Sequence, residues 1–244
     1  MIDLNNDELE RLKKRLNNYN NFFRGVNRNV PYSKKDIFEI FRFLLFPKKL
    51  YFKYGEGSRR NILIDLDDRS DHVIQINHLL TKYKLDYCGA KKDNYDLLIK
   101  SSFLRTWLVF FRISPSLLIY AIKNKKPIIP TISFCSRYSI FYSLAVNIKT
   151  ALKEQKLRNI LSLSFQLYPG FSDGIKYSTD DKVNIISIQH GLISQSVKGI
   201  NDWFDYDSDF FVAWNDNFHK YISDRINKKC ILLSEGKPYN YKFN

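Results

Sequence analysis

The tripeptide Gln189-His190-Gly191 carries the clearest chemical signal in this sequence, because it follows directly on the apolar, β-branched run 183–188. Such a run predicts a buried strand, with the histidine in the loop at the carboxyl end of that strand. Ligands of open α/β sheets bind at this edge of the sheet. Because histidine changes its charge near neutral pH, the pattern predicts a ligand-binding or catalytic role for His190. The alternative is a histidine that only caps the strand.

A second loop of this kind follows the strand predicted over 159–164. The segment 167–174, Leu-Tyr-Pro-Gly-Phe-Ser-Asp-Gly, places a glycine and a serine in a turn before a helix. A turn of this kind can present backbone N–H groups to an anion. Tyr168, Gly170 and Ser172 are therefore candidate substrate-binding residues. The spacing matches neither a Walker loop nor G-x-G-x-x-G, so it identifies no nucleotide fingerprint.

The strand-to-loop pattern recurs twice toward the C-terminus. The run 209–214 ends in Trp214, and the run 230–233 leads into Ser234-Glu-Gly-Lys-Pro238. Trp214 is accordingly a further candidate substrate-binding residue.

The remaining titratable residues give no comparable pattern. His72 and His78 are six residues apart, which is not the i, i+4 spacing of a helical metal-binding pair, and His219 begins an exposed helix. Four aspartates at the end of the first strand of the sheet can bind a cation, but capping of the next helix is the favoured interpretation. These are Asp65, Asp67, Asp68 and Asp71. No metal site is predicted.

Short β-branched runs alternate with amphipathic segments along most of the chain, which predicts an α/β fold. Strands are expected over 61–66, 85–88, 96–99, 159–164, 183–188, 209–214 and 230–233, with a strand or extended segment over 127–132. Helices are expected over 7–23, 33–45, 73–83, 103–123, 136–155 and 217–225, with a helix or loop over 171–177. We expect a Rossmann-like parallel sheet flanked by helices on both faces over residues 56–244, preceded by an N-terminal helical extension over residues 1–55.

Two apolar segments bear on membrane contact. The stretch 103–122 is interrupted by Arg105, Arg112 and Pro115, which predicts a pair of buried amphipathic helices rather than a membrane span. The basic, aromatic segment 42–54 has two interpretations. It lies at an anionic membrane surface, or it is a domain-edge helix that packs its aromatic rings inward.

The composition indicates a folded and strongly basic protein. Its 244 residues include 39 Lys and Arg against 25 Asp and Glu, a formal net charge of +14, and 44% of them are hydrophobic. The charge favours an anionic partner, although a codon bias toward A and T also raises the lysine count. No nucleic-acid partner is expected, because no helix-turn-helix, RNP or zinc-finger spacing is present. Three widely spaced cysteines and an acidic N-terminus predict a cytoplasmic protein without a signal peptide.

Residues 159–238 resemble a known family. A strand leading into Gln-His-Gly-Leu-Ile, the run Asp-x-Phe-Val-x-Trp, and a strand leading into Gly-x-Pro are similar to bacterial glycosyltransferases of the GT-B type that build capsule and lipopolysaccharide, including those that add Kdo. The resemblance implies a Rossmann-like N-terminal domain whose His-Gly loop faces an interdomain cleft. It implies that His190 is a base or transition-state stabiliser, that Gln189 orients sugar hydroxyls, and that Gly191 permits close backbone approach.

The resemblance also implies the reactants. The donor would be a nucleotide sugar, with no further cofactor certain, and the acceptor a glycan or lipid-linked glycan at the inner face of the cytoplasmic membrane. In that family the second domain, which holds most of the donor site, follows the Gly-x-Pro segment, whereas residues 239–244 alone follow it here. We therefore expect an N-terminal half that is truncated or needs a partner chain to supply the donor domain. A non-catalytic acceptor-binding half and a polyol-phosphate transferase are the alternatives.

Overall fold

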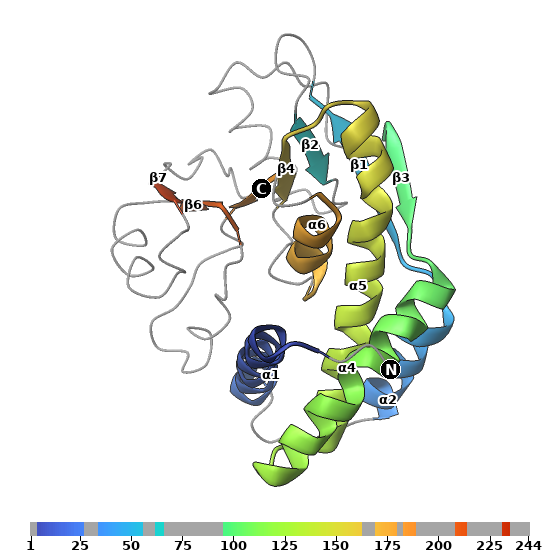
Figure 1. The fold of residues 1–244 in the computed structure, drawn as a ribbon, viewed down its shortest axis with the longest axis vertical. Helices are drawn as coiled ribbons and strands as arrows, with labels where there is room; N and C mark the ends of the chain where they lie inside the picture. The colour runs from blue at the N-terminus through green and yellow to red at the C-terminus, as the bar shows by residue number, and fades with distance from the viewer. Residues whose placement is uncertain are drawn as a thin grey trace, which may run out of the picture.

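The structure is a computed structural model of the chain. It describes residues 4–26, 34–55, 62–65, 95–162, 169–179, 183–188, 208–213 and 231–234. The described helices are α1 (Asn6–Val26), α2 (Lys34–Leu45), α4 (Phe103–Lys123), α5 (Ile128–Glu154) and α6 (Phe171–Thr179) (Figure 1). The described strands are β1 (Lys49–Tyr54), β2 (Ile62–Asp65), β3 (Leu97–Lys100), β4 (Asn159–Ser162), β5 (Asn184–Ile188), β6 (Phe210–Ala213) and β7 (Ile231–Ser234).

These strands form one seven-stranded sheet in the order β3-β1-β2-β4-β5-β6-β7. Strands β2, β4, β5, β6 and β7 pair in parallel, and β1 pairs antiparallel with both of its neighbours. The α/β class is confirmed as a mostly parallel, mixed sheet flanked by helices. The expectation of a fully parallel sheet is wrong at β1, because the short connection 55–61 joins β1 to β2. A parallel neighbour would need a crossover of a dozen or more residues.

Strand β1 occupies much of the basic, aromatic segment 42–54, where the alternatives were a domain-edge helix or a membrane-facing segment. Leu50 and Phe52 alternate with more polar positions and are buried, so their side chains contribute to the core. The strand belongs to the first 55 residues of the chain and pairs with β2 and β3, which follow position 55.

Helix α5 begins earlier than the sequence pattern predicts. Residues 127–132 were expected to be a strand or extended segment, but Pro127 is the N-cap of α5, and Pro130 lies in its first turn. Backbone N–H groups in the first turn of a helix have no partner within the helix, so proline is tolerated there. Thr131 donates its hydroxyl to the carbonyl oxygen of Pro127 at 2.9 Å, which supports the turn. The isoleucines and threonine favour a strand locally, and packing against the rest of α5 overrides that preference.

Helix α4 is a single helix rather than the expected buried pair. Pro115 lies inside it, on an exposed face of the helix. Ile113, Leu117 and Ala121 are buried on the opposite face. The remaining predicted elements over 73–83, 85–88 and 217–225 lie outside the described residues.

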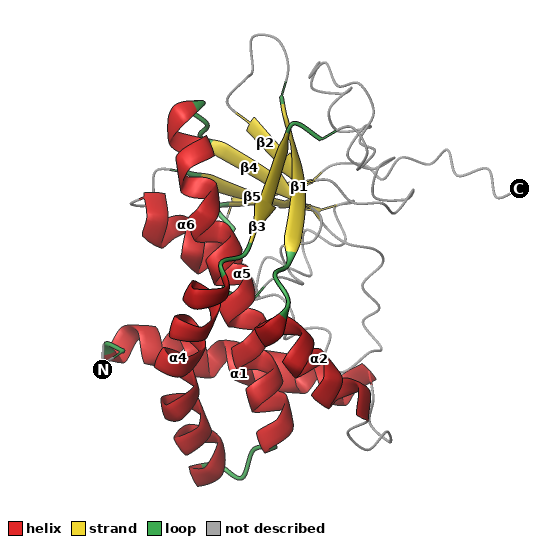
Figure 2. Cartoon of the chain, turned by 90° about the vertical axis from the view of Figure 1, so that its right-hand side faces the viewer, coloured by secondary structure: helices red, strands yellow, loops and turns green. Residues whose placement is uncertain are grey.

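The core lies between one face of the sheet and helices α5 and α6, which Figure 2 shows side by side against the strands. Phe52, Leu63, Ile160 and Ile185 are fully buried on this face. They pack against five residues of α5 and α6 that are also fully buried: Leu144, Ala145, Ile148, Phe171 and Ile175. Burying a side chain of this size stabilises a fold by about 1.5–3 kcal/mol.

Close contact between α5 and α6 depends on Gly174. A Cβ atom at this position would lie 2.6 Å from the Cβ of Ala145 and 2.7 Å from the carbonyl oxygen of Tyr142. Both neighbours belong to α5, and one of them is backbone, so neither can yield by rotating a side chain. The two helices are therefore held at a separation that only glycine permits.

We expect Gly174→Ala to lower the free energy of unfolding by about 1–3 kcal/mol, because the added methyl group forces α6 away from α5. Urea unfolding followed by circular dichroism measures this. Lys153→Ala, on the exposed end of α5, is the control and should change the value by less than about 0.5 kcal/mol. A Gly174→Ala protein as stable as the wild type would show that the helices are not packed this closely.

Candidate functional site

The carboxyl ends of β4, β5 and β6, each followed by a segment in which the sequence predicts chemistry, lie at one edge of the sheet. Strands β4, β5 and β6 are neighbours and point the same way, so the segments that follow them leave the sheet at one edge. Helix α6 connects β4 to β5 and therefore begins at this edge. Helix α2 leads into β1, and α4 follows β3, at the same edge, because β1 runs opposite to β2 and β3. Figure 2 shows α1, α2 and α4 gathered beyond this end of the sheet.

Most of the predicted site residues follow the described strands in the sequence. Strand β5 ends at Ile188, one residue before Gln189, and β6 ends at Ala213, one residue before Trp214. These strand ends are as the sequence predicts. The side chains themselves lie outside the described residues. They are Tyr168, Gln189, His190, Gly191 and Trp214.

Gly170 and Ser172 are described, and both lie at the N-terminus of α6. Gly170 has a backbone φ of +84°, which side-chain-bearing residues rarely adopt. A Cβ atom there would lie 2.6 Å from the carbonyl oxygen of Tyr138. Turn geometry and close packing on α5 thus account for this glycine. Ser172 is half-buried in the first turn of α6, where the sequence predicted backbone donors for an anion.

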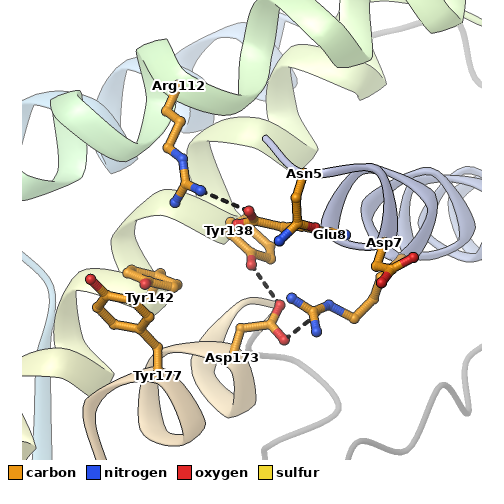
Figure 3. A pocket seen from close by; sticks show the side chains of 9 residues that line it. Asn5, Asp7, Glu8, Arg112, Tyr138, Tyr142, Asp173 and Tyr177 are labelled. Atoms are coloured by element: carbon orange, nitrogen blue, oxygen red, sulfur yellow. Dashed lines mark hydrogen bonds and ion pairs between the residues drawn. The ribbon is translucent and has the colours of Figure 1, made fainter. Parts of the chain in front are cut away.

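A cavity of about 340 Å³ opens at this same edge, between the N-terminal part of α1 and helices α4, α5 and α6 (Figure 3). Its walls combine charged side chains of both signs with tyrosine rings. The lining residues are Asn5, Asp7, Glu8, Arg11, Arg112, Tyr138, Tyr142, Asp173 and Tyr177. No group of three or more potential metal ligands is present in the described part of the chain.

The buried carboxylate of Asp173 is the electrostatic centre of the cavity. Arg15 donates from Nη2 to Oδ1 at 3.1 Å, and Arg11 Nε lies 3.4 Å from the same oxygen. Tyr138 donates its hydroxyl to Oδ2 at 2.5 Å. Asp173 also lies in the first turn of α6, where a negative charge is favoured by the helix dipole. The carboxylate therefore joins α1, α5 and α6.

These contacts set the protonation states. Burial by itself would raise the pKa of Asp173, but Arg15, Arg11 and the hydrogen bond from Tyr138 outweigh it, so the pKa lies below the ordinary value of 3.8. Burial, together with the neighbouring carboxylate, raises the pKa of Tyr138 well above its ordinary value. Burial likewise raises the pKa of Tyr142 to about 12. At neutral pH the aspartate is ionised and both tyrosines keep their protons.

An aromatic row and an ion pair form the rest of the wall. The ring of Tyr142 stacks on Tyr138 at a centroid distance of 6.0 Å and lies 6.1 Å from Tyr177. Tyr177 is 73% exposed and stands at the mouth of the cavity. Arg112 on α4 donates to Glu8 on α1 at 2.7 Å. Because Asp173 is engaged by its donors and the tyrosines are protonated, these buried groups of the cavity suit binding and positioning better than proton transfer.

The sequence alone does not reveal this cavity. Arg15 and Asp173 are 158 positions apart, and nothing near either residue indicates the other. Asp173 lies inside the predicted loop 167–174, and its place in the first turn of a helix is the one local signal that was present.

We expect Asp173→Asn to lower the free energy of unfolding at pH 7 by about 3–5 kcal/mol, because Arg15 is left buried without its counter-charge. The lowered pKa of Asp173 also makes the free energy of unfolding of the wild type depend on pH. The stability contributed by the wild-type carboxylate is fully present above the ordinary value of 3.8 and is lost as the pH falls through the lower folded-state value. The variant should lack this acid-induced loss.

Urea titrations from pH 7 to pH 3 measure both effects. Glu10→Gln, which removes an exposed carboxylate paired with Lys13, is the matched control and should be nearly neutral. Equal stability of Asp173→Asn and the wild type across this range would contradict the described network.

Comparison of the chain with family models, with curated proteins and with solved structures finds no match. The interpretation of the site therefore depends on the residues of this chain and on the topology that brings them together.

Proposed function

We propose that this protein takes part in the synthesis of a bacterial capsule or lipopolysaccharide by transferring a sugar from a nucleotide-sugar donor to a glycan acceptor. Its α/β sheet would correspond to the Rossmann-like N-terminal domain of a GT-B glycosyltransferase. The observation that carries the proposal is the parallel order β4-β5-β6-β7. It brings the carboxyl ends of β5, β6 and β7, which directly precede Gln189, Trp214 and Glu235 in the sequence, to one edge of the sheet, and this supports the resemblance.

The chemistry assigns the reactive role to His190. Sugar transfer requires that the acceptor hydroxyl lose a proton and that the charge on the departing phosphate be stabilised. A neutral imidazole accepts such a proton, and an imidazolium stabilises the phosphate. Among the described groups at this edge, Tyr138 and Tyr142 do not compete for the role because their pKa values are raised, and Asp173 does not because it is held by its donors.

The cavity supplies the acceptor side of the proposal. Tyrosine faces offer flat apolar surfaces against which a sugar ring can pack, and Glu8 and Arg112 offer hydrogen-bonding groups for hydroxyls. The N-terminus of α6 forms one wall of the cavity, and α6 begins at the edge of the sheet that β5 reaches at Ile188. Acceptor and histidine would thus meet at one edge.

We expect the purified protein to bind a CMP- or UDP-linked sugar saturably and His190→Ala to weaken this binding about tenfold to a hundredfold, the range for a lost hydrogen bond to a charged group. Isothermal titration across a panel of nucleotide sugars measures this. His78→Ala, the same substitution at a histidine with no assigned role, is the control. Absence of binding by the folded protein, or equal binding by His190→Ala, would overturn the proposal.

A non-catalytic role in acceptor binding is the second candidate, because the buried groups of the described cavity, Tyr138, Tyr142 and Asp173, are protonated or held by their donors. In either case Tyr177→Ala should weaken binding of the acceptor oligosaccharide about twofold to tenfold. The fold should be unaffected, since Tyr177 is largely exposed. Titration with capsule and lipopolysaccharide oligosaccharides measures this. If the protein binds the acceptor but no donor, the second candidate is favoured. If Tyr177→Ala leaves the affinity for the acceptor unchanged, the acceptor binds outside this cavity.

A further inference from the structure

Helix α4 presents an apolar face to solvent along nearly its whole length. The side chains on this face are between 55% and 68% exposed, and none of them is polar. They are Leu104, Leu108, Phe111, Ile119 and Ile122. At 1.5 Å per residue the stripe is about 27 Å long. The opposite face, with Ile113 and Leu117, is already buried against α1 and α5, so the exposed stripe is not explained by the core.

Helix α2 has a similar exposed face. Ile37, Phe38, Phe41 and Leu45 are between 45% and 65% exposed, and Phe46 directly after the helix is 63% exposed. The C-terminal end of α2 meets the N-terminal end of α4. Lys48 and Ser101 join these ends, because the amide of Ser101 donates to the Lys48 carbonyl at 2.9 Å and the amide of Lys48 donates to the Ser101 hydroxyl at 2.9 Å.

Both segments are basic, and the segment that carries α4 contains no acidic residue, whereas α2 contains Asp36 and Glu39, the latter paired with Arg137. Residues 97–153 contain no Asp or Glu, and neither do residues 40–55. Exposed cations flank the apolar stripes: Arg42 and Lys49 at the end of α2, and Lys123 and Lys125 at the end of α4. An exposed apolar helix face bordered by cations is the pattern of helices that lie in the interface of an anionic bilayer.

We propose that α2 and α4 form a docking surface for an anionic phospholipid bilayer, with the exposed apolar side chains in the headgroup region and the flanking cations against lipid phosphates. The alternative occupant, a second copy of this chain, would bring together two α4 surfaces that carry lysines and no carboxylate, which like-charge repulsion opposes. The inference concerns a surface outside the cavity and does not depend on sugar transfer.

Docking in this way places the cavity close to the membrane. Helices α2 and α4 meet the sheet at its carboxyl edge, and α4 contributes Arg112 to the cavity wall. A protein held by this surface would therefore present its carboxyl edge near the lipid headgroups, where a lipid-linked acceptor would lie.

Vesicle co-sedimentation tests the inference. The wild-type protein should bind vesicles that contain phosphatidylglycerol and phosphatidylcholine, bind pure phosphatidylcholine vesicles far more weakly, and lose affinity as salt is raised. Leu108→Glu combined with Phe111→Glu should reduce the partition coefficient about tenfold or more, because it places charges in the inserted stripe. Both side chains are at least 60% exposed, so the fold should persist, as circular dichroism can verify.

Two double variants with the same change in net charge distinguish docking through this surface from nonspecific attraction of a basic protein to anionic lipid. Lys123→Glu with Lys125→Glu should weaken binding to anionic vesicles about tenfold or more, since each lysine near the surface contributes about fivefold. Lys149→Glu with Lys153→Glu makes the same change in net charge on the C-terminal part of α5, which leads to the amino edge of the sheet, and should have a much smaller effect.

The inference would be overturned if both lysine double variants lost the same affinity for anionic vesicles. It would also be overturned if Leu108→Glu with Phe111→Glu left vesicle binding unchanged. A further result would overturn it as well: the wild-type protein is a dimer in analytical ultracentrifugation, Leu108→Glu with Phe111→Glu converts it to a monomer, and the wild-type protein does not bind vesicles. Because vesicle binding requires no nucleotide sugar, its outcome is independent of the donor titration.

Discussion

The arrangement at the carboxyl edge depends on the buried carboxylate of Asp173. A buried charge is tolerated only with compensating partners, and here the partners come from two other helices: Arg15 from α1 and Tyr138 from α5. The interaction therefore fixes where α1 lies relative to α5 and α6. Apolar packing alone would allow α1 to shift along these helices. The glycines at 170 and 174 bring α6 close enough to α5 for this bond to form, since a side chain at either position would clash with α5 backbone.

The same constraint shapes the cavity. Once α1 is held by Asp173, its residue Glu8 comes within 2.7 Å of Arg112 on α4, and a polar space is enclosed among four helices beyond the end of the sheet. Polar side chains that are committed to one another make poor acid–base catalysts, because their pKa values are shifted away from neutrality. Under the proposed function the helices would bind and orient the acceptor, and the titratable group would come from a loop that follows a strand, where His190 is located in the sequence.

Local patterns predicted most of the strands and helices because each strand end is marked by a change in periodicity within a few residues. Strands β4, β5 and β6 lie at the predicted positions for this reason. Two departures, the strand β1 and the first turn of α5, involve β-branched and aromatic residues whose local preferences fit either structure. The cavity could not be predicted, because its electrostatic centre joins residues 158 positions apart and depends on helix packing rather than on any local motif.

The polar contacts of α4 limit how it can meet a bilayer. By length and composition α4 is the one described helix apolar enough to cross a membrane. However, Arg112 is paired with Glu8 of α1, and Arg105 is hydrogen-bonded to Asn147 of α5. A crossing helix would have to give up these contacts or carry α1 and α5 with it, and either change would expose charges to hydrocarbon. An orientation in the plane of the interface would keep both arginines in their contacts with α1 and α5 while the exposed stripe meets lipid. In the proposed docking, the ion pair that encloses the cavity would thus also limit the depth to which α4 enters a membrane.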